Sequence, residues 1–255
     1  MSKPTTPLPP PSSLVPYYEA DGITVYNARC EDVLAAGLVP LAEVALIHAD
    51  PPYGIAYKPV GKSETAGSRR RTALPHGSRI RHFPAVTGDD KPFAPCTLLD
   101  IGRPAVLWGA NHYASRLPDS SSWLLWDKSP GFEPIDASDG EAAWSNLGGP
   151  LRIFRHHWRG ALRASEQADL HLHPTQKPIA LCAWVYARAK LKRGDLVFVP
   201  YLGSGPDLPA ARAMGLRVIA CDVEEWCCRT AVARLGAAPH PVPAADLGPL
   251  FAHPA

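Results

Sequence analysis

Apolar runs of about strand length alternate along the chain with patterns typical of amphipathic helices. The expected strands cover residues 23–27, 44–50, 104–110, 123–128, 195–199 and 217–222. The expected helices cover about 31–38, 111–117, 178–190, 209–214 and 224–235. Strands and helices that alternate in this way predict an α/β domain with a mostly parallel sheet and helices on its faces.

Both ends and two internal stretches lack this pattern. Residues 1–16 hold six prolines and residues 239–255 are similar, so we expect a flexible arm and a flexible tail around a domain of residues 17–238. Residues 55–92 carry eight basic and three acidic side chains without periodicity. A loop of this length inside a compact domain usually has a function or is disordered.

Residues 151–163 interleave arginines with aromatic side chains and contain no acidic residue. Basic residues among aromatic ones suit phosphate contact combined with base stacking. An exposed strand face here, and a solvated loop at 55–92, agree equally well with the sequence. The candidate nucleic-acid contacts in the two stretches are Lys58, Arg69, Arg70, Arg71, Arg155 and Arg159.

Composition narrows the class of protein. With 255 residues, 46% of them hydrophobic, the chain can bury a sizeable core. No run approaches the roughly 18 apolar residues of a membrane-spanning helix, and the first residues lack a secretory signal, so we expect a soluble intracellular protein without membrane contact. The six cysteines include no C-x-x-C pair, so neither a disulfide framework nor a metal site is expected. A net charge of +2 does not by itself indicate a nucleic-acid binder.

The strongest chemical signal is Asp50-Pro51-Pro52-Tyr53, which directly follows an apolar run. Open α/β sheets bind ligands at the carboxyl ends of their parallel strands. The Asp50 carboxylate and the Pro51 carbonyl offer acceptors for the two hydrogens of an amino group, and Tyr53 can stack on a flat ring. The motif therefore predicts a site for a planar heterocyclic amine, although Asp and Pro are also the usual residues of a type I turn.

A second signal is the glycine turn Gly203-Ser204-Gly205, which lies between an expected strand and an expected helix. This arrangement lets the backbone approach a nucleoside cofactor closely. Asp222 lies about 20 residues further on, the separation expected of a carboxylate that binds a ribose hydroxyl. Taken alone, an aspartate at a strand end is as consistent with a helix cap.

The segment His-Pro-Thr-Gln-Lys-Pro at 173–178 precedes the helix expected at 178–190. Thr175 or Gln176 could cap this helix, and its free N–H groups could bind the carboxylate of a cofactor. An ordinary N-cap with a helix-starting proline explains the segment without any ligand.

Together, D-P-P-Y at 50–53, H-P-T-Q-K-P at 173–178 and G-S-G at 203–205 resemble the motifs of DNA amino-methyltransferases. The resemblance covers roughly residues 23–235, and the motif order is similar to that of the permuted β-type group of phages and bacteria. It implies a single Rossmann-like α/β methyltransferase sheet with a circularly permuted motif order.

The resemblance also implies an activity and a set of site residues. The activity is S-adenosylmethionine-dependent methylation of the exocyclic amine of adenine, or less favourably cytosine, on a base flipped out of double-stranded DNA. The catalytic residues would be Asp50, Pro51, Pro52 and Tyr53. The cofactor-binding residues would be His173, Thr175, Gln176, Lys177, Pro200, Tyr201, Gly203, Ser204, Gly205 and Asp222. DNA-recognition inserts would lie at about 55–92 and 130–172 of a cytoplasmic enzyme, bacterial or phage-encoded, and a homodimer stays open.

The chain departs from the cofactor loop of that family, D-P-F-x-G-S-G-T-T. Val199 replaces the acidic residue, Pro206 and Asp207 replace the threonines, and Arg29 stands where an aspartate is common. These departures predict weak cofactor binding, which Val199→Asp would strengthen, and a repulsion between Asp207 and a cofactor carboxylate.

Two other functions stay open at this point. One is an inactive DNA-binding protein on the same scaffold, against which the intact D-P-P-Y motif argues. The other is an RNA or protein amide methyltransferase, against which the motif order argues.

Overall fold

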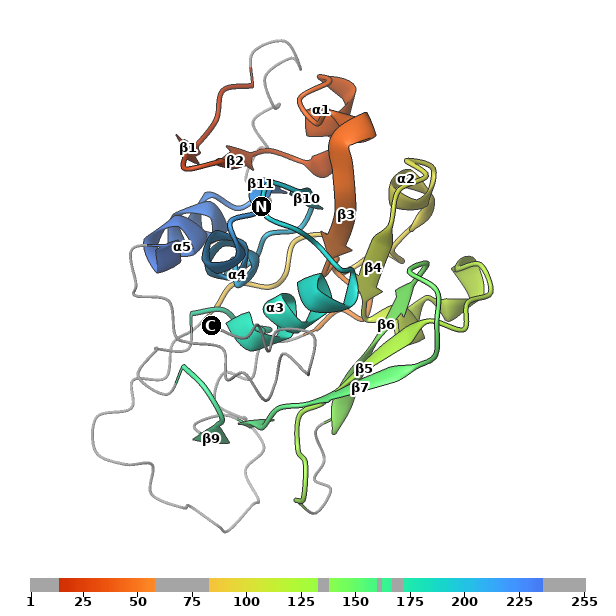
Figure 1. Ribbon diagram of the computed structural model, residues 1–255. Helices are drawn as coiled ribbons and strands as arrows, with labels where there is room; N and C mark the ends of the chain where they lie inside the picture. The colour runs from red at the N-terminus through yellow and green to blue at the C-terminus, as the bar shows by residue number, and fades with distance from the viewer. Residues whose placement is uncertain (1–13, 58–82, 133–137, 160–161, 167–171, 236–255) are drawn as a thin grey trace, which may run out of the picture.

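The computed structural model describes residues 14–57, 83–132, 138–159, 162–166 and 172–235 (Figure 1). Within them, nine strands form one sheet in the order β1-β2-β11-β10-β3-β4-β6-β5-β7, and β8 pairs with β9 in a second sheet. Most of the expected arm, the whole tail and the candidate contacts Lys58, Arg69, Arg70 and Arg71 lie outside the described residues.

The strands are β1 (Tyr18–Ala20), β2 (Ile23–Asn27), β3 (Val44–Ala49), β4 (Ala105–Trp108), β5 (Trp123–Asp127), β6 (Gly140–Ser145), β7 (Arg152–Arg155), β8 (Trp158–Arg159), β9 (Leu162–Arg163), β10 (Leu196–Val199) and β11 (Arg217–Asp222). The helices are α1 (Cys30–Ala35), α2 (Cys96–Leu99), α3 (Ile179–Arg188), α4 (Asp207–Met214) and α5 (Glu225–Leu235), with short 3-10 helices η2 (Leu41–Glu43), η3 (Ala110–His112) and η4 (Ala114–Arg116). No helix of the described residues has the length and apolar character needed to cross a membrane.

The centre of the main sheet is parallel, as the sequence predicts. Strands β2, β11, β10, β3 and β4 run in one direction, whereas β6 is antiparallel to both β4 and β5. From β3 the chain continues to β4, and from β10 it continues to β11 on the other side. The carboxyl ends of β3 and β10 are therefore neighbours at the point where open α/β sheets form a ligand crevice.

Alternate residues of each strand point to opposite faces of the sheet, and helices cover both faces. Leu46 and Val197 pack in one core cluster with α3, α4 and α5. Ile47 and Phe198 pack in a second cluster with α1 and α2. Figure 1 shows the two helix groups on opposite sides of the central strands. Burial on both faces explains why these strands are almost continuously apolar in the sequence.

Two expected helices differ from the observed ones. Helix α4 begins at Asp207, two residues before its expected start, with Pro206 as N-cap and Pro209 in the first turn. Backbone N–H groups have no intrahelical partner in a first turn, so both prolines are tolerated there. The helix expected at 111–117 is instead the pair of short helices η3 and η4.

The region expected as a recognition insert at 130–172 contributes two strands to the main sheet. Strand β6 lies between β4 and β5, and β7 forms the edge. Phe154 of β7 is buried, and its ring centroid lies 5.3 Å from that of Trp184. Phe154 is thus part of the core and is not available to stack on a base, whereas Trp158 of the same stretch is half-buried and lines the cavity described below.

Gly205 gives a direct test of the packing between the glycine turn and α5. Its φ is +64°, and a Cβ atom there would lie 2.3 Å from the Cβ and 2.9 Å from the Cα of Ala231. Gly37 has a similar φ of +69° with nothing within 4 Å of an added Cβ. We expect Gly205→Ala to lower the free energy of unfolding by about 1–3 kcal/mol more than Gly37→Ala, because only the first adds a clash to the backbone strain.

Urea unfolding of the two variants without ligand measures this difference. Equal losses would show that the turn moves away from α5 without cost.

Candidate active site

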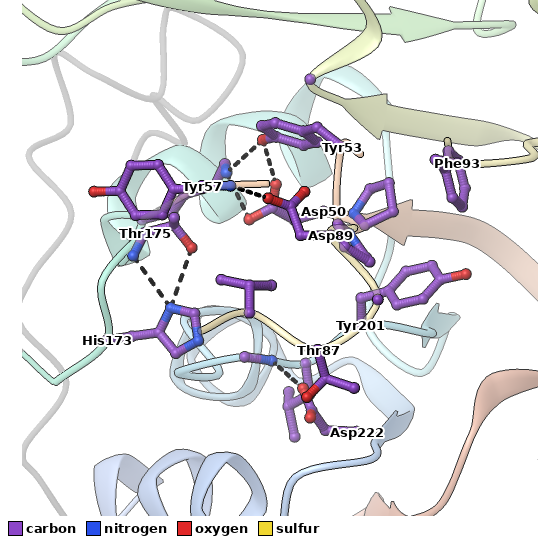
Figure 2. Close-up of a pocket in the computed structure, with 18 of the residues that line it drawn as sticks. Asp50, Tyr53, Tyr57, Thr87, Asp89, Phe93, His173, Thr175, Tyr201 and Asp222 are labelled. Carbon is purple, nitrogen blue, oxygen red and sulfur yellow. Dashed lines mark hydrogen bonds and ion pairs between the residues drawn. The ribbon is translucent and has the colours of Figure 1, made fainter. Parts of the chain in front are cut away.

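Asp50 lies at the carboxyl end of β3, with both carboxylate oxygens bound. The Tyr53 hydroxyl donates to Asp50 Oδ1 at 2.6 Å, and the Lys177 ammonium lies 2.5 Å from Oδ2 (Figure 2). Lys177 also donates to the Tyr53 hydroxyl oxygen at 3.1 Å. The D-P-P-Y motif and the H-P-T-Q-K-P segment, more than a hundred positions apart, therefore meet in one hydrogen-bonded group.

Glu141 of β6 completes this group. Its Oε2 lies 2.9 Å from the Lys177 ammonium, and its Oε1 accepts from Lys128. Burial by itself would raise the pKa of Glu141, but Lys177 and Lys128 outweigh burial and lower that pKa to about 2. Burial would likewise lower the pKa of Lys177, yet Asp50 and Glu141 raise it. Two cations and two anions thus balance one another in a buried site, the condition under which buried charges are tolerated.

The ring of Tyr53 is fixed by its neighbours. It stacks with His112 at a centroid distance of 5.2 Å and an interplanar angle of 16°. On Gly109, whose φ is +69°, an added Cβ would lie 2.0 Å from the ring, so this position requires glycine. Burial, followed by the charges of Asp50 and Glu141, raises the pKa of Tyr53, which keeps its hydroxyl a donor.

The backbone after Tyr53 is held by Asp89, which is 4% exposed. Asp89 Oδ1 accepts the N–H of Gly54 at 2.8 Å, and Oδ2 accepts the N–H of Tyr57 at 2.6 Å. A buried carboxylate with backbone donors on both oxygens fixes the loop that leaves the motif.

At the other end of the site, Asp222 closes the glycine turn. Its Oδ2 accepts the N–H of Gly203 at 2.7 Å, and its Oδ1 accepts the N–H of Glu224 at 2.9 Å. Burial raises the pKa of Asp222, and the two backbone donors act in the opposite direction. A direct hydrogen bond thus joins Gly203 and Asp222, the two positions whose separation in the sequence suggested a ribose-binding carboxylate.

One cavity of about 1040 Å³ joins the two ends. Predicted site residues that line it are Asp50, Pro51, Pro52, Tyr53, His173, Thr175, Gln176, Lys177, Pro200, Tyr201, Gly203, Ser204 and Asp222. Gly205 does not line it and packs on Ala231 instead. Figure 2 shows Asp50 and Tyr53 on one side of the space and Asp222 with Thr87 on another.

The structure corrects the expected helix cap. Helix α3 starts at Ile179 without a side-chain cap from Thr175 or Gln176. The N–H of Ile179 donates instead to Glu166 Oε1 at 2.7 Å, and Glu166 Oε2 pairs with Arg234 of α5 at 2.6 Å. Glu166, which is ion-paired with Arg234, therefore occupies one of the N–H groups at the start of α3 that were expected to be free for a cofactor carboxylate.

Other predicted residues are placed as follows. The His173 ring stacks on Trp226 at 5.2 Å beside the cavity. Arg155 is exposed on the edge strand β7, with Asp127 at 4.0 Å. Arg159 of β8 pairs with Asp139 at 3.2 Å.

Val199 does not face the cavity, contrary to the expectation from the cofactor loop. It is 1% exposed and belongs to the core cluster shared with α3, α4 and α5. An aspartate in its place would bury a charge among apolar side chains. The expected gain in cofactor binding from Val199→Asp is therefore not supported.

Sequence reasoning missed Lys128, Glu141 and Asp89 as site residues. A single charged residue at a strand end or in a loop carries no signal by itself. Their roles depend on partners from other parts of the sheet.

Comparison with known proteins gives the fold. No family model matches the chain. Over 80 residues it is 35% identical to the Type II methyltransferase M2.DpnII of Streptococcus pneumoniae, covering 31% of this chain and 30% of that protein, so the match spans less than a third of its length. The solved PvuII DNA methyltransferase (cytosine-N4-specific) superposes with a TM-score of 0.53 at 14% identity, covering 85% of this chain and 87% of that one.

The fold is that of a methyltransferase. The M1.HpyAVI–SAM complex is also similar, with a TM-score of 0.48 and 16% identity over 84% of this chain and 98% of that chain. Within the methyltransferase fold, the strand that carries D-P-P-Y precedes the strand that carries the glycine turn along the chain, as the resemblance implied.

The buried charges around Lys177 predict a stability that depends on Glu141. Glu141→Gln leaves two cations with one carboxylate fewer, and we expect it to lower the free energy of unfolding by roughly 3 kcal/mol at pH 7. Because the folded pKa of Glu141 is about 2, its contribution is complete above the ordinary pKa of a glutamate and is lost as pH falls towards 2. The difference between the wild type and the variant should therefore shrink between about pH 5 and pH 2.

Urea titrations at several pH values measure this difference in the free energy of unfolding. The exposed pair of Glu43 and Arg217, at 2.8 Å, provides the control, and Glu43→Gln should cost at most about 1 kcal/mol. A Glu141→Gln loss as small as that of the control, or one independent of pH, would contradict the assignment.

Proposed function

We propose that the protein is an S-adenosylmethionine-dependent DNA methyltransferase that modifies the exocyclic amine of adenine, with cytosine as the alternative. The observation that carries the proposal is that Asp50 and Tyr53 share one cavity with the glycine turn and Asp222. A group that can orient an amine and a site suited to a nucleoside cofactor are thus open to each other. The similarity to named DNA methyltransferases supports the same conclusion.

The cavity fits the proposed cofactor in size and in chemistry. Ligand pockets typically measure about 300–1000 Å³, so a cavity of about 1040 Å³ has room for a nucleoside cofactor and a base. Gly203 has a φ of +52° and no side chain to fill the space. The Asp222 carboxylate lines the cavity, and each of its oxygens would have a lone pair left for a ribose hydroxyl beside its backbone donor. S-adenosylmethionine, when bound, supplies a methyl group activated by the positive sulfur.

Asp50 and Pro51 would prepare the amine. Its lone pair is delocalised into the base, and accepting its hydrogens at Asp50 Oδ and the Pro51 carbonyl turns that lone pair towards the methyl group. A carboxylate oxygen has two lone pairs, so Asp50 can accept an amine hydrogen while it keeps Tyr53 and Lys177. Transfer would then be a direct displacement by the amine nitrogen, in which the sulfur would leave with the electrons of its methyl bond as a neutral thioether and the extra proton on the nitrogen would pass to water. No covalent enzyme intermediate would be needed.

The base must leave the duplex to reach this site. Stacking on Tyr53 would offset roughly 1–3 kcal/mol of the cost of unstacking. The exposed His112 ring now covers one face of Tyr53, so a flipped base would displace His112 or use the remaining face.

Double-stranded DNA is the proposed partner, and Arg155 is an exposed basic side chain on the edge strand β7. We propose a cytoplasmic enzyme, bacterial or phage-encoded, of the restriction-modification type, and a homodimer stays open.

Asp50→Ala should abolish methyl transfer while the protein stays folded, because Lys177 keeps Glu141 and the Tyr53 hydroxyl as partners. The measurement is incorporation of radiolabelled methyl groups into a mixed-sequence duplex, followed by nucleoside analysis, which also separates adenine from cytosine. Asp119→Asn, an exposed aspartate outside this cavity, is the control with unchanged activity. Near-normal turnover in Asp50→Ala would refute the mechanism.

DNA binding by the two basic stretches should leave different signatures. Arg155→Gln should weaken binding to the preferred duplex by about 1–3 kcal/mol and barely affect a scrambled one, as for a base contact. Replacing Arg69, Arg70 and Arg71 together should weaken binding to every duplex. It should also reduce the slope of log K against log salt concentration by about 0.9 for each phosphate that an arginine no longer neutralises.

Titrations at several salt concentrations distinguish the two cases. Arg229→Gln, an exposed arginine on α5, is the control that should change neither affinity nor slope. An unchanged slope in the triple variant would remove residues 55–92 from the DNA interface.

A further inference from the structure

A buried hydrogen-bonded network lies between the catalytic strand and the cofactor turn. His48 Nδ1 of β3 lies 2.5 Å from Asp207 Oδ1 of α4, and the Tyr186 hydroxyl of α3 donates to the same oxygen at 2.5 Å. Exposed fractions are 4% for His48, 6% for Asp207 and 0% for Tyr186. Both His48 and Asp207 nevertheless line the cavity.

The hydrogen bonds fix the protonation of His48. The indole N–H of Trp108 can only donate, and it lies 2.9 Å from His48 Nε2, which must therefore accept. The single ring proton is then on Nδ1 and is donated to Asp207. Asp207 is thus held by a neutral imidazole and a neutral phenol.

Asp207 remains an ionised group without a cationic partner. Hydrogen bonds from the His48 ring N–H and the Tyr186 hydroxyl both stabilise its ionised form. Among the described residues, no lysine or arginine nitrogen lies within 4.0 Å of its carboxylate. The N-terminus of α4 contributes about half a positive charge, which leaves the site negative.

The second oxygen of this carboxylate has spare capacity. Both hydrogen bonds reach Oδ1, and no N–H or O–H group of the described residues donates to Oδ2. The thiol of Cys182 is its other polar neighbour and a weak donor. A nine-tenths buried carboxylate in a cavity wall, with a free acceptor and no countercharge, is suited to a cationic ligand.

The position of Asp207 in the cavity indicates which part of the cofactor would bind to it. His48 lies on β3, and Asp50 follows the end of that strand two residues later. Asp207 follows the glycine turn, whose Gly203 contacts Asp222. Because β10 lies between β3 and β11 in the sheet, Asp207, which follows β10, lies between the strand end beside Asp50 and the strand end at Asp222.

We propose that Asp207 binds the α-ammonium group of the methionine part of S-adenosylmethionine through Oδ2. This inference rests on the proposed function. It reverses the expectation that Asp207 repels the cofactor, because a carboxylate that meets the ammonium group attracts it. A metal ion is disfavoured at His48, Cys182 and Asp207, although their ligand atoms lie within 4.8 Å of one another, because hydrogen bonds already use both nitrogens of His48.

Calorimetry with three ligands tests the proposal on Asp207→Asn, whose amide oxygen can still accept from His48 and Tyr186. S-adenosylmethionine has an ammonium and a sulfonium group, S-adenosylhomocysteine has only the ammonium group, and methylthioadenosine has neither. We expect the first two to bind about 10- to 100-fold more weakly to the variant, by equal factors, and methylthioadenosine to bind unchanged.

The other outcomes overturn the proposal. Equal weakening of all three ligands would show a structural role, and weakening of S-adenosylmethionine alone would assign Asp207 to the sulfonium. No change in any affinity would remove Asp207 from the site. A wild-type protein that binds none of the ligands would instead refute the proposed function itself.

One further variant provides an alternative substitution at Asp207, and another is a control. Asp207→Thr introduces the residue that the resembling family carries at this position, and it should show the same ligand pattern if Asp207→Asn folds poorly. Asp100→Asn changes an exposed aspartate and should leave all three affinities unchanged.

Discussion

The pairing of Lys177 with Asp50 and Glu141 is the interaction on which the candidate site depends. A buried ammonium group is stable only where anions compensate for the lost hydration, and these two carboxylates come from β3 and from β6. The segment that carries Lys177 also leads into α3, whose residues pack on the sheet. One side chain thus fixes the position of the D-P-P-Y carboxylate relative to two strands and a helix.

A second connection crosses the same region of the sheet. His48 and Asp207 join β3 to α4, as Lys177 joins β3 to the segment before α3. Both connections lie beside the crevice where β3 and β10 are neighbours. The Asp50 carboxylate and the helix that follows the glycine turn are therefore both joined to β3 by polar contacts.

Local pattern predicted the central strands, the D-P-P-Y turn and the glycine turn, because each is encoded by neighbouring residues. Local pattern failed where the surroundings of a side chain are made by residues distant in the sequence. Val199 looked like a missing acidic contact but points into the core, and Phe154 looked like a base-stacking ring but packs on Trp184. Asp207 looked unfavourable because its partners His48 and Tyr186 lie far away in the sequence. The sequence did not indicate Glu141 and Asp89 as site residues, because the role of a single carboxylate depends on the donors that bind it in the folded protein.

The place of β10 between β3 and β11 also governs how the chain can acquire its structure during synthesis. β2 pairs with β11, and the side chain of Asn27 reaches the carbonyl of Asp222 across 195 positions. Until the ribosome has released β10 and β11, β2 lacks its parallel neighbour and β3 lacks one of its two. Pairings so remote in sequence close large loops and form slowly. The emerging chain therefore carries unpaired strand edges for most of its translation, and the site can assemble only after nearly the whole domain has been made.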